Sequence, residues 1–186
     1  MTVARDAAEQ RSLSHFDRLL GGKGPMAIIE TFDDVTLLQY VDADFGVSHF
    51  TTLGFDRVGA PSVNPTELVI TARPHQEERA LDLLRYAVRH SPEFSDLTFG
   101  SAMLLPHPLL EDLPVYGLMF DASPWDEELN LILSPDGQAI ELAVLSLLPM
   151  TRGDTELLKE KGPDAFDAAV EATDADVYDL FRTVAI

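Results

Sequence analysis

Histidine is the side chain best suited to metal binding and proton transfer, and the sequence contains five. They are His15, His49, His75, His90 and His107. None belongs to an HxH, HxxxH or HExxH pattern, the spacings that bring two metal ligands together. The chain also has no cysteine, so thiolate ligands and disulfides are excluded. The sequence therefore predicts no metal site, and each histidine is expected at the surface or half-buried.

Patterns that present a nucleophile or bind a nucleotide are also missing. Ser101, in FGSAM, is the nearest approach to the GxSxG turn, but its neighbours do not match. The GxGxxG and Walker patterns, which bind phosphates, do not occur, and neither does a DxDxDG calcium loop. We predict no catalytic residues and no cofactor.

Carboxylates are the remaining groups that could act as acids or bases. The adjacent pairs Asp33-Asp34 and Glu111-Asp112 and the run Asp126-Glu127-Glu128 all fall where turns are expected. Solvated turn carboxylates are far commoner than a general acid and base. A hydrolase that uses scattered carboxylates would need a deep pocket holding two or more of them with raised pKa values. We expect a protein that is not an enzyme and keep this hydrolase as an alternative.

The net charge of −19, from 32 acidic and 13 basic residues, is the most unusual bulk property. Such a field repels phosphate backbones and anionic membrane surfaces, so we expect neither nucleic-acid nor membrane binding. The longest apolar run, about nine residues, is too short to cross a bilayer, and no signal-peptide pattern opens the chain, which favours the cytoplasm. The acidity either keeps the protein soluble or complements a basic partner, and the sequence leaves both readings open.

The acidic loop around Trp125 is the predicted partner-binding site. Trp125 is the only tryptophan and is followed directly by Asp126, Glu127 and Glu128. An aromatic side chain beside charges is a common anchor for a protein partner, although it could equally cap the edge of the core. The Gly- and Pro-rich stretch 54–65 is a second candidate, since a long loop within a compact domain is often functional.

The apolar run 142–148 is typical of a strand buried on both faces. We expect it to be a central strand beside which the other strands pair. Pro149 is expected to end this strand because it lacks a backbone N–H. Gly153 then permits a turn, and Asp154 or Thr155 caps the helix that follows.

The other elements follow from the period of the apolar residues and from Gly and Pro breaks. Strands are predicted over 26–32, 35–41, 45–53, 66–71, 101–105, 115–120 and 129–133. Helices are predicted over 3–20, 76–90, 156–161, 164–171 and 174–183. This order predicts an α+β class: one domain over 1–186, with a mixed, largely antiparallel sheet of about six to eight strands packed by helices.

Several segments resemble the suppressor-of-fused-like (SUFU-like) domain family. They are a Gly-Pro stretch before a strand ending in Phe32, TLGFDRV before TELVIT, LLRYAVRH, SAMLLPHPLLED, YGLMFDASPW and LLPMTRGDTELLKEKG. The resemblance covers about 25–166 and implies a mixed α/β domain without enzymatic activity. In animals the family member restrains a transcription factor by binding it, and bacterial single-domain members, which this chain resembles, are predicted to be immunity proteins. No site residues carry over.

Acidity and resemblance together favour a non-enzymatic protein-binding domain of the immunity type, which neutralises a basic toxin such as a nuclease. A regulatory adaptor that binds an endogenous protein is the alternative, and a neighbouring toxin gene would separate the two. The sequence predicts neither the identity of the partner nor the oligomeric state.

Overall fold

The computed structural model describes residues 7–20, 27–32, 34–59, 62, 64–94, 96–123, 126–173, 176–183 and 185–186. Its helices are α1 (Ala7–Leu19), α2 (Glu77–His90), α3 (Arg152–Lys161) and α4 (Pro163–Ala172). Its strands are β1 (Ala27–Phe32), β2 (Val35–Asp42), β3 (Val47–Leu53), β4 (Thr66–Ala72), β5 (Ser101–Leu104), β6 (Gly117–Asp121), β7 (Leu131–Leu133) and β8 (Ile140–Met150). Short 3-10 helices lie at Phe55–Arg57 (η1), Ser91–Glu93 (η2) and Glu127–Leu129 (η3).

The described strands form one eight-stranded sheet in the order β1-β2-β3-β4-β8-β6-β5, with β7 paired to the beginning of β8. β4 and β8 run parallel, while the other paired strands are antiparallel. The predicted α+β class and the mixed, largely antiparallel sheet are therefore confirmed.

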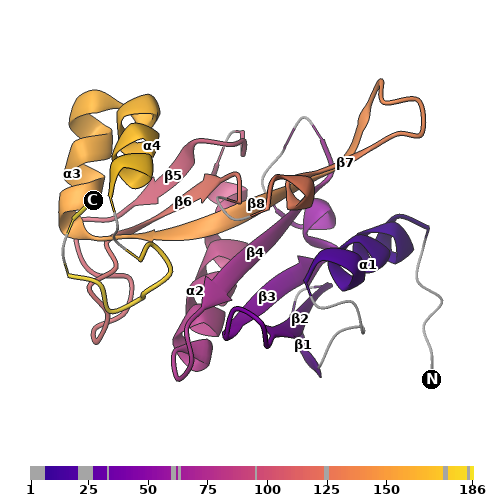
Figure 1. Cartoon of the computed structure of the whole chain (residues 1–186), viewed down its shortest axis with the longest axis horizontal. Helices are drawn as coiled ribbons and strands as arrows, with labels where there is room; N and C mark the ends of the chain where they lie inside the picture. Colours follow the sequence, from indigo (N-terminus) through magenta and orange to yellow (C-terminus); the bar gives the residue numbers. More distant parts are fainter. Residues whose placement is uncertain are drawn as a thin grey trace.

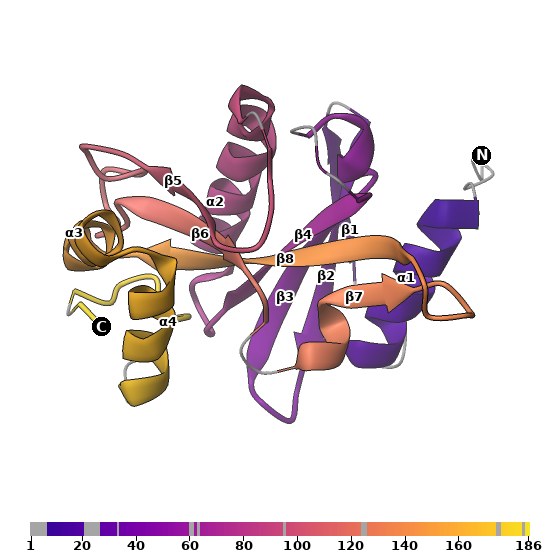
Figure 2. The same cartoon turned by 90° about the horizontal axis from the view of Figure 1, so that it is seen from above.

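β8 organises the layers because its two faces carry different helices (Figures 1 and 2). Leu142 and Val144 pack beneath α1, whereas Leu148 and Met150, further along the same face, pack beneath α3 and α4. Leu145, on the opposite face, belongs to the large core under α2. Alternate side chains of a strand point to opposite faces, so an apolar run without alternation fits burial on both.

The sequence predicts that Pro149 ends β8, but this prediction is wrong. The strand continues to Met150, and Pro149 lies opposite Leu118 of β6. The carbonyl of Pro149 accepts a hydrogen bond from Arg182, while that of Met150 accepts one from Tyr116. The N and the carbonyl of one strand residue point to the same side, so the missing N–H of Pro149 faces away from β6 and the ladder survives.

The start of α3 was also predicted wrongly. Thr151, not Asp154 or Thr155, is the N-cap, and Asp154 completes a capping box by accepting the backbone N–H of Thr151. Gly153 lies inside the first turn of α3. A Cβ added there would lie 2.5 Å from the Cβ of Ala185, so the glycine permits the close approach of the C-terminal residues.

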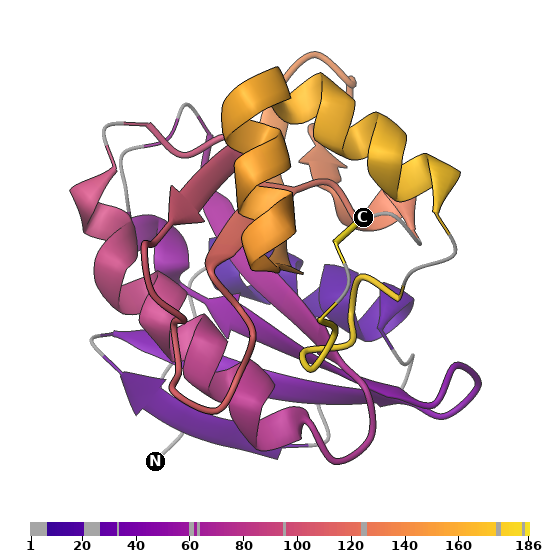
Figure 3. The same cartoon turned by 90° about the vertical axis from the view of Figure 1, so that its left-hand side faces the viewer.

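The helix predicted over 174–183 does not form in its described part, 176–183. The side chains of Asp176 and Asp179 accept the backbone N–H groups of Tyr178 and Phe181. Such local bonds compete with a helix. The resulting C-terminal segment, residues 176–186 with residue 184 not described, runs from the α4 end back across the molecule (Figure 3).

The remaining predicted elements are present with shifted ends. The helix predicted over 3–20 corresponds to α1, with residues 3–6 outside the described ranges. The strands predicted over 115–120 and 129–133 begin two residues later, at Gly117 and Leu131. The stretch predicted as the loop 54–65 contains η1.

Candidate protein-binding surface

The predicted partner-binding residues lie beside α1 as far as they are described. Trp125 falls outside the described residues. Asp126 caps η3 by accepting the N–H of Glu128 at 2.9 Å, and Glu127 and Glu128 are exposed. The carboxylate of Glu128 pairs with Arg18 of α1 at 2.8 Å. The described acids of the loop therefore sit on an ordered turn at the molecular surface.

His15, a residue of α1, contacts this acidic turn through a hydrogen bond. Its Nε2 lies 3.1 Å from the carbonyl oxygen of Leu129, and both residues are buried. Burial lowers the pKa of His15 from its usual value, with the hydrogen bond to Leu129 acting in the opposite direction. A neutral imidazole at this position holds the turn without adding positive charge near Asp126 and Glu128.

A hollow of about 280 Å³ lies between α1, η1 and the start of β8. Four carboxylates line it, and they belong to Glu9, Asp56, Glu67 and Glu141. Arg57 pairs with Glu9 and Arg11 pairs with Glu141 at its walls. This is where a carboxylate-based enzyme would be sought.

Glu67, at the wall of this hollow, is bound to the backbone of a neighbouring turn. Its carboxylate accepts hydrogen bonds from the hydroxyl of Thr52 (2.6 Å) and the N–H groups of Gly54 (2.6 Å) and Phe55 (3.2 Å). Burial raises the pKa of Glu67 to about 7, against the opposing effect of these bonds. The geometry makes Glu67 the anchor of η1.

A second carboxylate with a raised pKa lies elsewhere. Asp167 of α4 has its pKa raised to about 6, first by desolvation and then by the neighbouring Asp121. Neither residue lines the hollow that contains Glu67. Glu67 and Asp167 therefore do not share this hollow, whereas the hydrolase alternative requires two carboxylates with raised pKa values in one pocket.

His15 and His49 are buried, whereas the sequence predicts each histidine at the surface or half-buried. His49 is buried and its Nδ1 lies 3.0 Å from the hydroxyl of Thr71, whereas His90 contacts Glu93 beside η2. Within the described ranges, no three histidine, aspartate or glutamate side chains gather closely enough to hold a metal ion. None of the helices in the described part of the chain is long and apolar enough to cross a membrane.

The arginines are engaged within the molecule. Eight of the nine arginines in the described ranges form ion pairs with carboxylates, and the ninth, Arg89, lies over the ring of Phe32 at 5.2 Å. The pairs are Arg11–Glu141, Arg18–Glu128, Arg57–Glu9, Arg73–Asp176, Arg79–Asp82/Asp112, Arg85–Glu30/Asp82, Arg152–Glu156 and Arg182–Asp154. The acidic residues outnumber these cations, so the field around the molecule stays strongly negative.

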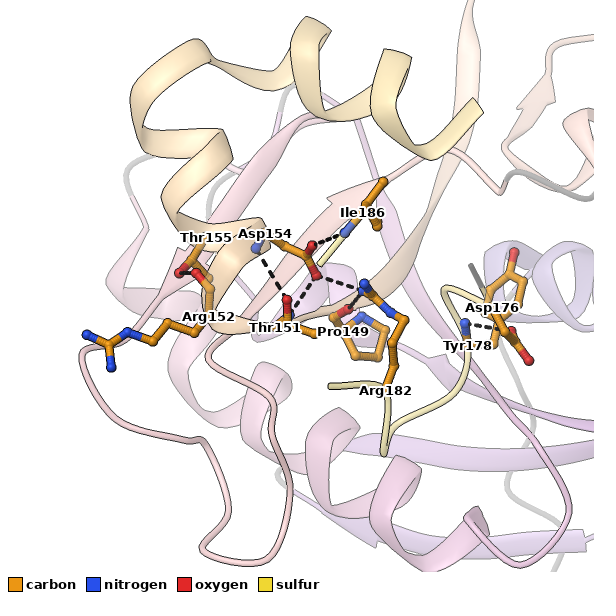
Figure 4. Close-up of polar contacts among 9 residues, drawn as sticks. All are labelled: Pro149, Thr151, Arg152, Asp154, Thr155, Asp176, Tyr178, Arg182 and Ile186. Atoms are coloured by element: carbon orange, nitrogen blue, oxygen red, sulfur yellow. Dashed lines mark hydrogen bonds and ion pairs between the residues drawn. The ribbon is translucent and has the colours of Figure 1, made fainter. Parts of the chain in front are cut away.

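One of these pairs is buried and fixes the C-terminal segment (Figure 4). Asp154 accepts hydrogen bonds from the guanidinium of Arg182 (2.7 Å) and the N–H groups of Thr151 (2.7 Å) and Ile186 (2.8 Å). The side chains of Asp154 and Arg182 are 0% and 7% exposed. The sequence indicates only a capping role for Asp154, because nothing local points to a partner 28 residues away.

The opposite end of the same segment is held beside β4. Arg73 pairs with Asp176 at 2.6 Å, and the side chain of Gln76 donates to Asp179 and accepts the N–H of Leu180. The C-terminal segment is therefore tied both to the residues that follow β4 and to the start of α3.

The chain matches the family model "Suppressor of fused protein (SUFU)" over residues 30–183. No curated protein sequence matches it significantly.

The fold is shared with a set of solved structures that includes three suppressor-of-fused structures. A suppressor-of-fused homologue from Neisseria gonorrhoeae FA 1090 has 17% sequence identity and a TM-score of 0.66, over 95% of this chain and 97% of that chain. The structure of the Sufu–Fu complex gives 13% identity and a TM-score of 0.63, over 89% and 84% of the two chains. Drosophila Suppressor of Fused has 12% sequence identity and a TM-score of 0.58. The match covers 87% of this chain but 46% of the Drosophila chain. Because the family model spans most of the sequence, the chain belongs to the suppressor of fused (SUFU) family.

Proposed function

We propose that this chain is a non-enzymatic protein-binding domain of the immunity type, which binds and neutralises a basic toxin. The observation that carries the proposal is the engagement of the described arginines in internal pairs, which leaves a large excess of negative charge at the surface. Such a field accelerates encounter with a basic protein and disfavours acidic ones. Membership of a family in which one structure is a Sufu–Fu complex supports a protein partner.

The proposed contact residues are Trp125, Asp126, Glu127 and Glu128. Glu127 and Glu128 are exposed on a turn that Asp126 and His15 order, so they would lose little conformational freedom on binding. The pair between Glu128 and Arg18 is exposed on both sides and is worth little in water, so a partner's cation can replace Arg18 at small cost.

The test is capture from a lysate of the native organism, first at low and then at raised salt, with bound proteins identified by mass spectrometry. One basic protein, released as the salt concentration rises, is the expected result. Recovery of no basic protein contradicts the proposal.

A charge-reversed variant locates the contact. Asp126→Lys, Glu127→Lys and Glu128→Lys together should abolish capture. The matched control reverses three exposed acids on other elements, Glu111, Glu160 and Glu171, and so changes the net charge equally. Equal loss in both variants would mean that overall charge, and not this turn, determines binding.

Neutralisation is tested by co-expression. The captured protein alone should stop growth of a host cell, and the wild-type chain should restore growth. A captured protein that is harmless to the host would favour the regulatory adaptor instead.

A further inference from the structure

A pocket of about 160 Å³ lies where the β2–β3 hairpin meets the C-terminal segment. Asp42 and Phe45 come from the hairpin, His49 from the middle of β3, Arg73 from the residue after β4, and Tyr178 from the C-terminal segment. Figure 3 shows the hairpin projecting from the sheet on the side where the yellow C-terminal segment crosses. The walls of the pocket therefore depend on the contacts that fix the C-terminal segment.

One aromatic wall of the pocket is unusually accessible. Phe45 is 76% exposed, more than any other large hydrophobic side chain of the described chain. Exposing this ring to water is unfavourable, and nothing in the hairpin covers it. Tyr178 adds a second ring and is labelled at the right of Figure 4.

Tyr178 also brings an unsatisfied polar group. Its hydroxyl oxygen is buried and has no hydrogen-bond partner among the described residues. Burial raises the pKa of this phenol, so the group stays protonated at neutral pH. An unpaired buried hydroxyl is costly, and a hydrogen-bonding group entering the pocket would supply its missing partner.

The charges at the pocket favour a cation. Asp42 lines the pocket, and its carboxylate accepts the N–H groups of Asp44 and Phe45. The charge of Arg73 is offset by Asp176 at 2.6 Å. Burial lowers the pKa of His49 to about 4, so its imidazole adds no positive charge at neutral pH. With Arg73 offset and His49 neutral, Asp42 leaves the lining of the pocket negative.

We propose that this pocket binds one arginine side chain presented by the basic protein partner. This inference rests on the proposed function and names the side chain that the surface selects. A guanidinium is planar and stacks on an exposed ring such as Phe45. It carries only hydrogen-bond donors, which suit the carboxylate of Asp42 and the hydroxyl of Tyr178. A lysine offers the charge without the planar stack.

Short peptides test the pocket without knowledge of the partner. The probes are acetyl-Gly-Arg-Gly-amide and the same peptide with lysine, leucine or citrulline at the centre, citrulline being a neutral isostere of arginine. Binding is followed by ¹H–¹⁵N NMR of the full chain. The arginine peptide should give saturable shifts at Phe45, His49, Thr71 and Tyr178, and the citrulline peptide should bind about tenfold more weakly. Equal binding of citrulline or leucine, or no shift at these residues, overturns the proposal.

Three variants refine the test. Asp42→Asn keeps an oxygen for the hairpin turn but removes the charge, and Phe45→Leu keeps an apolar side chain but removes the ring. Each should weaken arginine-peptide binding about fivefold or more, while Phe99→Leu, at another exposed phenylalanine, should not. Tyr178→Phe should weaken binding without lowering the melting temperature, because the hydroxyl that it removes has no partner in the described chain. Unchanged binding in all three contradicts the inference.

The outcomes separate this inference from the proposed function. If Phe45→Leu binds the basic protein as tightly as the wild-type chain does, the pocket assignment fails and the protein-binding role stands. If the arginine peptide binds but the wild-type chain captures no basic protein, the proposed function fails and the pocket stands.

Discussion

Glu67 and His49 are both almost fully buried, and burial moves their pKa values in opposite directions because it disfavours the charged form of each. The pKa of Glu67 rises to about 7 and that of His49 falls to about 4. Raising the pH through the interval from 4.5 to 7 therefore costs stability through Glu67. Lowering the pH through the interval from 6.5 to 4 costs stability through His49.

Glu67→Gln isolates the first of these contributions. Below pH 4.5 the carboxyl is protonated in both the folded and the unfolded chain, whereas near pH 6 only the folded chain retains the proton. The free energy of unfolding of the wild type minus that of the variant should fall by about 3 kcal/mol between pH 4.5 and pH 8. Urea unfolding followed by circular dichroism at four pH values measures it. A difference that does not change with pH would contradict the assignment.

The buried pair of Asp154 and Arg182 should respond very differently from a surface pair on the same helix. Asp154→Asn keeps the shape but leaves the guanidinium buried without its counter-charge, which should cost about 3 kcal/mol. Glu156→Gln is the matched control, because Arg152 and Glu156 are 74% and 61% exposed and their pair should contribute under about 0.5 kcal/mol. Similar losses in chemical denaturation would show that Asp154 is no more important than a surface acid.

The contacts of single residues are the feature that is hardest to predict from the sequence. Sequence patterns placed Glu67 within a strand and Asp154 near a helix start, and both placements are confirmed. Their chemistry depends on Gly54, Phe55, Arg182 and Ile186, which only the tertiary fold brings near.

At the scale of elements, the start of α3 and the C-terminal residues form one unit. Gly153 has low helix propensity, about 1 kcal/mol below alanine, yet it occupies the first turn. The close approach of Ala185 explains it, since an added Cβ would overlap the alanine methyl group.

A double-mutant cycle tests this unit. Gly153→Ala alone should lower the free energy of unfolding by about 1 kcal/mol, because it displaces Ala185 and strains the bond from the Ile186 N–H to Asp154. In the background of Ala185→Gly the same substitution should stabilise, as expected for an ordinary helical position. The predicted coupling between the two sites is about 1–2 kcal/mol. Strict additivity in thermal unfolding would refute the contact.

Strands were predictable because apolar alternation and Gly or Pro breaks are local signals. Pro149 was misread because its effect depends on which side of β8 carries the neighbouring strand, and that is a property of the sheet. The C-terminal helix was misread because Asp176 and Asp179 can either begin a helix or close turns. Hydrogen bonds with the side chain of Gln76 accompany the turns.

At the scale of the whole molecule, the amino-acid composition predicts an acidic surface. The structure adds that the described arginines are engaged in contacts within the molecule. The sheet order, with β8 between β4 and β6, could not be read from the sequence because it pairs β8 with β4, which lies more than seventy residues away in the chain. That order places α1 and the acidic turn at one end of β8 and the C-terminal segment with its pocket toward the other.

The most direct test of the central claim is isothermal titration calorimetry of the chain with its purified captured partner at low and raised salt. We predict that the dissociation constant rises steeply with salt for the wild type. We also predict that reversal of residues 126–128 removes most of the affinity, while reversal of Glu111, Glu160 and Glu171 leaves most of it. An affinity that is independent of salt, or equal in both reversed variants, would contradict a role based on the acidic surface.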